Sequence, residues 1–238
     1  MTTLLTEPTR SRPTATASED ETISRHFLRR GHGAEFEMEA DWVRAHLPPG
    51  AGRVVDLGCG IGSLFDAIGT SRAIGVDHQP SGLPHTRSRF PLVPLVCGGA
   101  ERLPFADRSL DALTLQHVVE HFAETRKVFR ELHRVLRPGG VLLLLTPNAE
   151  FRDHGVFEDP THVHIFNRRD LPNGLRDVGF DIVDLRTIGL PWFRDYGSVP
   201  SAWRLRRFVT QHAIALSMVP PWRWSGQTLC CAARRPIQ

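Results

Sequence analysis

Two carboxylates and a glycine-rich turn are the residues of this sequence best spaced to bind a ligand. The turn contains Gly58, Gly60 and Gly62 and follows a short apolar run. Glycines permit positive φ angles and let a ligand approach the backbone, and a helix that starts after them presents free N–H groups. Asp56 lies just before the turn. Asp77 ends the next apolar run, fifteen residues after Gly62, where its carboxylate can accept hydrogen bonds from both hydroxyls of a ribose.

The spacing of the turn argues against a dinucleotide as that ligand. A dinucleotide-binding turn has the pattern Gly-x-Gly-x-x-Gly, which would require a third glycine at position 63. That position is Ser63. Asp56 points the same way, because a carboxylate there attracts a cationic ligand group and repels a diphosphate. The residues therefore favour a nucleotide-like ligand with a cationic end and no pyrophosphate.

Alternating strands and helices are expected to position these groups. Apolar runs predict strands at residues 53–57, 73–76, 92–96, 112–115, 141–145, 180–187 and 227–233. Helical spacing predicts helices at residues 64–68, 118–136, 170–179 and 202–219, and two helices separated by a hinge at Gly31 and Gly33 within residues 23–47. The five consecutive apolar residues 141–145 suit a central parallel strand that is covered on both faces. This order predicts an α/β fold with a doubly wound, mostly parallel sheet.

The glycine turn resembles motif I of the class I S-adenosylmethionine (SAM)-dependent methyltransferases, in the small-molecule group called type 11. Five further segments resemble motifs of that family in the same order: residues 75–77, 100–105, 117–122, 136–140 and 146–148. The resemblance covers about residues 50–188. It implies a Rossmann-like sheet of seven strands whose last strand is antiparallel, and SAM as the methyl donor.

The resemblance also implies which residues contact SAM. They are Asp56, Gly58, Cys59, Gly60, Gly62, Asp77, His78, Gly99, Ala100, Glu101 and Gln116. One position departs from the family, which usually has Asp where this chain has Gly99. A hydrogen bond to the adenine amino group is lost with that side chain, at a cost of about 1 kcal/mol.

Three histidines are candidates for a general base, which methyl transfer needs only if the acceptor must lose a proton. His117 follows the fourth predicted strand, while His162 and His164 alternate in a polar segment after the fifth. Satisfied or solvent-facing histidines are the alternative for each. The resemblance implies a structural role for His121. Although His154, Asp159, His162 and His164 could supply ligands, we expect no metal site.

The sequence predicts five segments along the chain. They are a disordered tail at 1–22, a helical cap at 23–49, the SAM-binding core at 50–188, a helical insertion or lid at 189–226, and a final strand of the core at 227–238. The basic helix expected within the fourth segment could alternatively lie on a membrane or on another protein.

Composition restricts the partners and the compartment. The net charge is only +3, and hydrophobic residues make up 41% of the chain, so a nucleic-acid partner is not expected. No apolar run is long enough to span a membrane, and the four cysteines suit a reducing compartment. We expect a cytoplasmic monomer or homodimer that methylates a small natural-product or sugar-linked acceptor, preferably on oxygen, with nitrogen or carbon possible. A non-catalytic SAM-binding protein and an NAD-dependent oxidoreductase are the alternatives.

Overall fold

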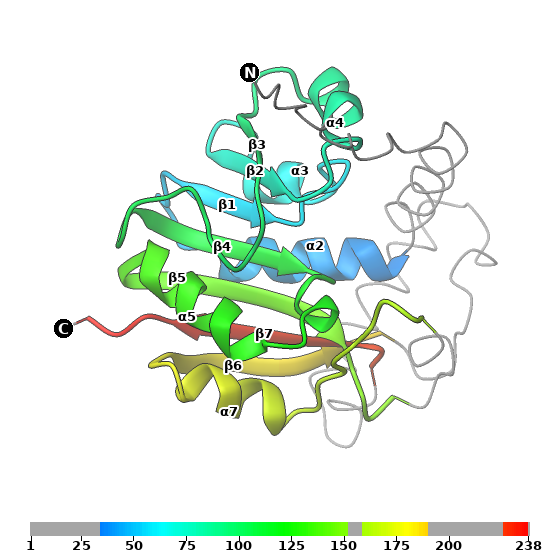
Figure 1. Cartoon of the computed structure of the whole chain (residues 1–238), viewed down its shortest axis with the longest axis vertical. Helices are drawn as coiled ribbons and strands as arrows, with labels where there is room; N and C mark the ends of the chain where they lie inside the picture. Colours follow the sequence, from blue (N-terminus) through cyan, green and yellow to red (C-terminus); the bar gives the residue numbers. More distant parts are fainter. Residues whose placement is uncertain (1–33, 152–158, 190–225, 238) are drawn as a thin grey trace, which may run out of the picture.

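A seven-stranded sheet runs through the centre of the protein, here described from a computed structural model (Figure 1). The structure describes residues 34–151, 159–189 and 226–237. The spatial order of the strands is β3-β2-β1-β4-β5-β7-β6. Their bounds are β1 Val54–Leu57, β2 Ala73–Asp77, β3 Leu95–Cys97, β4 Leu110–Gln116, β5 Leu136–Pro147, β6 Asp181–Ile188 and β7 Thr228–Arg234.

The pairing confirms the expected fold class. Strands β1 to β5 pair in parallel, and β7 pairs antiparallel with both β5 and β6. The last strand is therefore inserted between two earlier ones and is not an edge strand. Every residue from Val141 to Pro147 is buried, which fits a strand covered on both faces.

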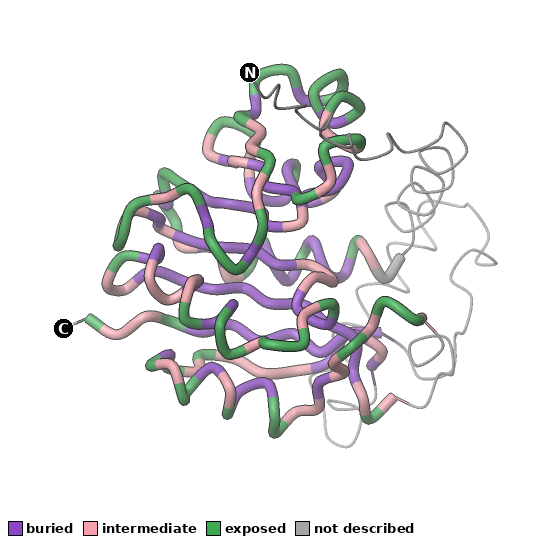
Figure 2. Tube along the Cα trace, in the orientation of Figure 1, coloured by how far each residue is buried: buried purple, intermediate pink, exposed green. Residues whose placement is uncertain are grey.

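Helices cover both faces of the sheet. Their bounds are α2 Ala34–His46, α3 Phe65–Ile68, α4 Leu83–Arg89, η1 Val119–His121, α5 Thr125–Val135 and α7 Asp170–Arg176. One apolar cluster joins α2 and α3 to the sheet, and a second joins α5 and α7 to its other face. Figure 2 shows buried residues along the strands and exposed residues along the outer sides of the helices. None of the helices in the described residues is long and apolar enough to cross a membrane.

The structure describes residues 34–49 of the predicted helical cap, and α2 is the helix among them. Its Trp42 is buried and donates from Nε1 to Asp184 Oδ2 on β6 at 3.2 Å. His46 Nε2 lies 3.1 Å from the same carboxylate oxygen. Helix α2 is thus tied to the sheet by polar contacts as well as by packing.

Several element predictions are wrong in their bounds, two of them for reasons that the structure shows, and one helix was not predicted. The helix expected at 118–136 is divided into η1 and α5, because the chain is extended at Phe122 (φ −108°, ψ 126°). Strand β3 begins at Leu95 and not at residue 92, since Pro94 has no N–H to donate to a neighbouring strand. Helix α4, which has Pro84 in its first turn, has no counterpart among the predicted helices.

Several predictions fall outside the described residues. They are the tail at 1–22, the hinge at Gly31 and Gly33, the residue His154, and the helix at 202–219 within the insertion at 189–226.

Candidate functional site: a cofactor site beside a buried charge cluster

The glycine turn lies at the carboxyl end of β1, between β2 and β4. Gly58 and Cys59 both donate their backbone N–H to Val76 O, at 2.7 and 3.1 Å, which holds the turn against β2. Gly58 has a φ of 74°, and a Cβ on it would lie 2.3 Å from Val118 Cγ2. Only glycine fits there, because the backbone is left-handed and the segment after β4 packs directly on it. The glycine spacing therefore serves the fold of the turn as well as access to a ligand.

Asp56 is a buried carboxylate that no cation neutralises within the described part of the chain. It faces Thr114 on the neighbouring strand, and Thr114 Oγ1 donates to Asp56 Oδ1 at 2.7 Å. Burial raises the pKa of Asp56 to about 7, against the Thr114 hydrogen bond, and the charge of Asp77 adds to the rise. A buried acid of this kind gains a partner when a cationic group binds beside it. Asp56 therefore fits the ammonium group of SAM.

Asp77 ends β2 with its carboxylate held by two backbone groups. Gly60 N–H donates to Oδ2 at 2.8 Å, and Gln79 N–H donates to Oδ1 at 2.8 Å. A carboxylate oxygen has more than one acceptor direction, so each can also accept from a ribose hydroxyl. His78 beside it is exposed, with Nδ1 3.6 Å from Asp77 Oδ1.

The loop after β3 carries three further predicted cofactor residues, Gly99, Ala100 and Glu101. Ala100 is buried, and Glu101 is exposed and pairs with Lys127 Nζ at 3.2 Å. Gly99 has open space around it: a Cβ built there would meet no atom within 4 Å. The family usually has an Asp at this position, and the space that its side chain would occupy is not filled by other described residues here.

His117 lies in a buried cluster of charges next to the glycine turn. Its Nε2 is 3.3 Å from Glu39 Oε1, and its Nδ1 is 3.5 Å from Glu120 Oε1. Burial lowers the pKa of His117, but the charge of Glu39 and the contacts with both carboxylates outweigh it and raise the pKa to about 10. Its φ of 54° is unusual for a residue with a side chain. His117 is thus held as an imidazolium between two carboxylates.

Glu39 on α2 is a member of this cluster that sequence reasoning missed. It accepts hydrogen bonds from Gln116 Nε2 and from Thr228 Oγ1, both at 2.5 Å. Burial raises the pKa of Glu39, but the charge of His117 and these hydrogen bonds lower it overall. Its neighbours Met38 and Ala40 are buried as well, so the fold identifies Glu39 as an interior carboxylate and the sequence pattern does not.

Glu120 completes the cluster on its other side. Its Oε2 accepts from Thr146 Oγ1 on β5 at 3.1 Å. Burial raises the pKa of Glu120, but the contact with His117 and the charge of His117 lower it overall. Its backbone carbonyl accepts from Val163 N and His164 N, both at 3.0 Å, so the segment after residue 158 is joined to η1.

The structure places the other two histidine candidates near this cluster in different surroundings. The side chain of His162 is 3% exposed, and its ring centroid lies 5.2 Å from that of His121. The ring of His164 packs on Phe166 at 4.2 Å between centroids. Both histidines lie in the segment that is hydrogen-bonded to Glu120, and His117 contacts the Glu120 side chain.

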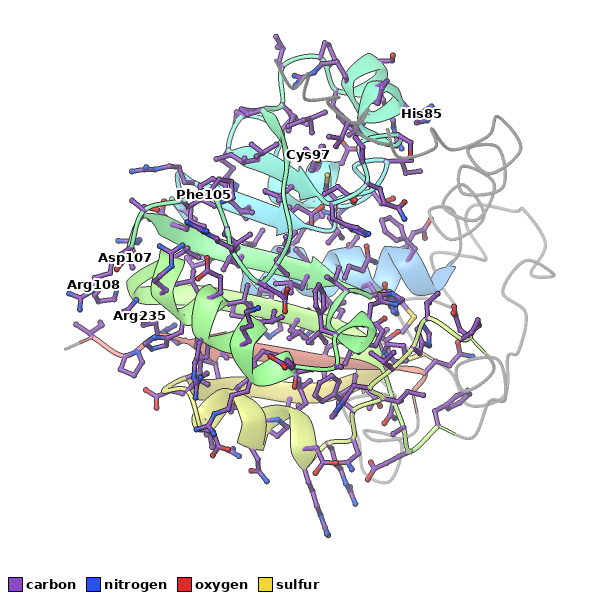
Figure 3. All side chains as sticks on the ribbon, viewed as in Figure 1. His85, Cys97, Phe105, Asp107, Arg108 and Arg235 are labelled. Atoms are coloured by element: carbon purple, nitrogen blue, oxygen red, sulfur yellow. The ribbon has the colours of Figure 1, made fainter. Side chains whose placement is uncertain are left out.

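Figure 3 shows Asp107, Arg108 and Arg235 near one another at the end of the sheet where β4 begins, away from the carboxyl end of that strand. Arg134 Nη1 pairs with Asp107 Oδ1 at 2.6 Å, and Arg235 Nη1 donates to Leu136 O at 2.8 Å. Asp107 and Arg108 precede β4, Arg134 precedes β5, and Arg235 follows β7. They belong to the far side of the fold and not to the cofactor site.

Comparisons with known proteins agree with this geometry. Residues 55–144 match a family model described as a methyltransferase domain. A probable S-adenosylmethionine-dependent methyltransferase of Mycolicibacterium smegmatis is 36% identical over 147 residues, which cover 59% of this chain and 56% of that protein. One of Mycobacterium tuberculosis is 33% identical over 178 residues, covering 68% of this chain and 64% of that protein. A demethylmenaquinone methyltransferase of Roseiflexus is 34% identical over 121 residues, covering 48% and 50%.

Solved structures share the fold at lower identity. A SAM-dependent methyltransferase of Thermotoga maritima, titled a possible histamine N-methyltransferase, has a TM-score of 0.67 at 19% identity and covers 90% of this chain and 95% of its own. The [4+2]-cyclase SpnF has a TM-score of 0.61 at 23% identity, covering 84% and 81%. A cyclase among the structures with this fold shows that the fold alone does not fix the reaction.

The family follows from the matched domain and the relatives together. The chain spans 56% and 64% of the length of the two mycobacterial relatives. The match to the family model includes the glycine turn and the carboxylates Asp56 and Asp77, in a sheet of the expected order. Residues 55–144 therefore carry a methyltransferase domain of the class I, type 11 group, and the two mycobacterial relatives are named as probable SAM-dependent methyltransferases.

Proposed function

We propose that this protein transfers a methyl group from SAM to a small-molecule acceptor, and that the preferred acceptor atom is oxygen. The observation that carries the proposal is the meeting of Asp56, the glycine turn and Asp77 at one edge of the sheet, next to Gln116 and His117. Carboxyl ends of parallel strands are where open α/β sheets bind ligands.

The chain's own residues bind and orient the reactants. SAM supplies a methyl group that its sulfonium already activates. Asp56 is placed for the ammonium group of the cofactor, Asp77 for the ribose, and Gly99 with Ala100 for the adenine. Proximity and alignment of this kind account for a large part of the rate of a bimolecular displacement.

His117 has a positioning role in this proposal and does not act as the base. With a pKa of about 10 it carries its proton at neutral pH and has no lone pair to accept another. Its charge fixes Glu39, which in turn holds Gln116 by a hydrogen bond. For an acceptor hydroxyl, His162 and His164 remain as candidates to take the proton.

The nature of the acceptor is inferred from the relatives and from the charge. The demethylmenaquinone methyltransferase relative acts, by its name, on a small molecule. The net charge of +3 is too small to favour a nucleic-acid partner. We therefore propose a natural-product or sugar-linked acceptor, with nitrogen or carbon as the alternative methylated atoms, in a cytoplasmic protein that is a monomer or a homodimer.

Calorimetry with SAM tests the cofactor site directly. The wild-type protein is expected to bind SAM, and Asp77→Ala is expected to weaken binding at least about tenfold, since two hydrogen bonds to a charged acceptor are lost. Asp107→Ala is the matched control, because this exposed aspartate lies at the end of the sheet where β4 begins, away from the carboxyl end of that strand (Figure 3). Absence of SAM binding, or an Asp77→Ala variant that binds like wild type, would overturn the proposal.

Two rival functions give different results in the same assays. An NAD-dependent oxidoreductase would bind NAD in competition with SAM, which Ser63 and Asp56 disfavour. A non-catalytic protein would bind S-adenosylhomocysteine and transfer no methyl group from labelled SAM to any acceptor in a panel of phenols, sugars and amines. Transfer to at least one acceptor separates the enzyme from that rival.

A further inference from the structure

We propose that Glu120, His121 and His162 bind one divalent transition-metal ion of the zinc class. Each of the three offers one ligand atom, and these atoms lie within 4.8 Å of one another. One carboxylate oxygen and two imidazole nitrogens form a ligand set typical of zinc, with a fourth position left for water or a substrate oxygen. Ligands about 2 Å from an ion lie at most about 4 Å apart. Binding therefore draws the three side chains slightly inward.

The first argument for a cation is the burial of the Glu120 carboxylate. Its side chain is fully buried, and among the described residues its only ion-pair neighbour is His117, which also contacts Glu39. The attraction between a carboxylate and a cation is stronger in the interior, where the effective dielectric constant is low.

The second argument is an unused acceptor atom on Glu120. Its Oε1 is buried and has no hydrogen-bond partner among the described residues, and His117 Nδ1 lies 3.5 Å from it. The other oxygen, Oε2, already accepts from Thr146. Buried acceptors are nearly always satisfied, so an unsatisfied oxygen on a carboxylate that groups with two imidazoles indicates a ligand that it binds.

The surroundings of the two histidines are those of metal ligands. His121 Nδ1 lies 2.9 Å from Thr161 O, so its proton is on Nδ1 and the lone pair of Nε2 is available. His162 Nε2 is 3.7 Å from Asp159 Oδ2, a carboxylate that can orient the ring. His121 is exposed, which gives an ion a path from solvent to the buried carboxylate.

The site changes the role assigned to His162. A histidine that ligates a metal through its lone pair does not serve as a general base, so the base candidate is then His164. The inference goes beyond the proposed methyl transfer and does not depend on it, because the ligands are defined without SAM or an acceptor.

Titration of the full chain with Co²⁺ and Zn²⁺, each as the metal alone, tests the site. The protein should carry no polyhistidine tag and should first be treated with a chelator. The expected result is one ion bound per chain, with Co²⁺ giving visible absorption bands of a nitrogen and oxygen site and no thiolate charge-transfer band. His121→Ala and His162→Ala should each weaken binding at least about tenfold.

His85→Ala and Cys97→Ser serve as matched controls and are expected to bind the metal as tightly as wild type. Both residues are exposed and, as Figure 3 shows, belong to a different region of the fold, on α4 and at the end of β3. Because Glu120→Gln removes a buried charge that the fold uses, its thermal unfolding with and without Zn²⁺ is the readout: wild type should be stabilised by Zn²⁺ and Glu120→Gln should not.

Three outcomes would overturn the metal site. They are no binding at micromolar metal, binding that survives both histidine substitutions, and a thiolate band that disappears in Cys97→Ser. SAM binding to the same wild-type sample is measured in parallel. A protein that binds SAM but no metal refutes only the metal site, and one that binds the metal but no SAM refutes only the proposed function.

Discussion

Asp56 and His117 are both buried beside the glycine turn, but their environments affect them differently. Asp56 meets a hydroxyl and no cation, so burial governs it and its pKa rises to about 7. His117 meets two carboxylates, which overcome the effect of burial and raise its pKa to about 10. At neutral pH Asp56 is therefore partly protonated and has no cationic partner among the described residues. His117 is a cation held between two carboxylates.

The raised pKa of Asp56 predicts that its carboxyl group lowers the stability of the protein while it strengthens cofactor binding. The folded pKa of about 7 exceeds the unfolded value of about 3.9. Between these two pH values the native state therefore keeps a proton on Asp56 that the unfolded state has lost. This contribution to the free energy of unfolding therefore falls as pH rises from about 4 to 7. Asp56→Asn should be the more stable protein above pH 7, by roughly 2 to 4 kcal/mol.

Urea unfolding at pH 5 and pH 8 measures that difference, and SAM calorimetry supplies the second half of the test. Wild-type affinity should increase between pH 6 and pH 8 as Asp56 ionises, whereas Asp56→Asn should bind SAM more weakly and without that increase. Equal pH dependence in the two proteins would show that Asp56 does not titrate in this range.

Gly99 predicts a gain of affinity by substitution. A Cβ there meets nothing within 4 Å, so Gly99→Asp should fold normally and place a carboxylate beside the adenine amino group. One recovered hydrogen bond of about 1 kcal/mol corresponds to roughly fivefold tighter SAM binding. Calorimetry on Gly99→Asp and Gly99→Ala separates two causes of tighter SAM binding, the new carboxylate and the reduced backbone freedom. Only Gly99→Asp should bind SAM more tightly.

At the scale of elements, the buried charges join parts of the chain that are distant in sequence. Glu39 on α2 contacts Gln116 at the end of β4, His117 directly after it, and Thr228 on β7. Helix α2 therefore helps to hold Gln116 and His117 beside the cofactor site, although it precedes the matched methyltransferase domain in the sequence. The position of α2 depends on contacts between buried polar groups, so the loss of one partner is expected to destabilise it.

Glu39→Ala should accordingly cost about 3 kcal/mol of unfolding free energy, because it leaves the His117 charge with one carboxylate in place of two. Glu37→Ala on the exposed side of the same helix should change stability by less than about 0.5 kcal/mol. Chemical denaturation of both variants measures the contrast. A Glu39→Ala variant as stable as Glu37→Ala would mean that His117 is not charged in the native state.

The same charge cluster predicts that the stability of the protein decreases at alkaline pH. His117 has a folded pKa of about 10 against about 6.5 unfolded, so its stabilising contribution is complete below pH 6.5 and is lost as pH rises to 10. Denaturation midpoints of the wild type should fall between pH 7 and pH 10. That fall should be shallower in Glu39→Ala, in which the His117 pKa is closer to its ordinary value.

At the scale of the whole molecule, the sequence predicted the sheet better than it predicted the site. Apolar runs of four or five residues marked β1, β2 and β5 because parallel strands are buried on both faces. The division of the 118–136 helix was not predicted, since it depends on the Glu120 side chain turning inward to His117 and Thr146. Local periodicity carries no information on a partner that lies 26 residues away.

The cofactor carboxylates were predictable and the charge cluster was not, for the same reason. Asp56 and Asp77 lie at fixed distances in sequence from the glycine turn, so spacing is enough to find them. Glu39 is 77 residues from Gln116 and 189 residues from Thr228, and only the folded sheet brings them together.

The cysteines give a test of the whole fold. Cys59, Cys230 and Cys231 are buried, and burial raises the pKa of each thiol, whereas Cys97 is exposed. A thiol reagent at pH 8 should therefore react quickly with one cysteine in the native protein and with all four in denaturant. Mass spectrometry should locate the fast reaction at Cys97. Rapid modification of Cys230 or Cys231 would contradict the inserted position of β7.

The insertion of β7 between β5 and β6 also bears on how the chain is made. A ribosome produces β6 (Asp181–Ile188) before β7 (Thr228–Arg234), yet β6 pairs with the sheet only through β7. Until that strand emerges, β5 presents a bare hydrogen-bonding edge and β6 has nothing to pair with. The nascent protein therefore has an interval in which its sheet is open to other chains, and a chaperone that shields strand edges would act during it.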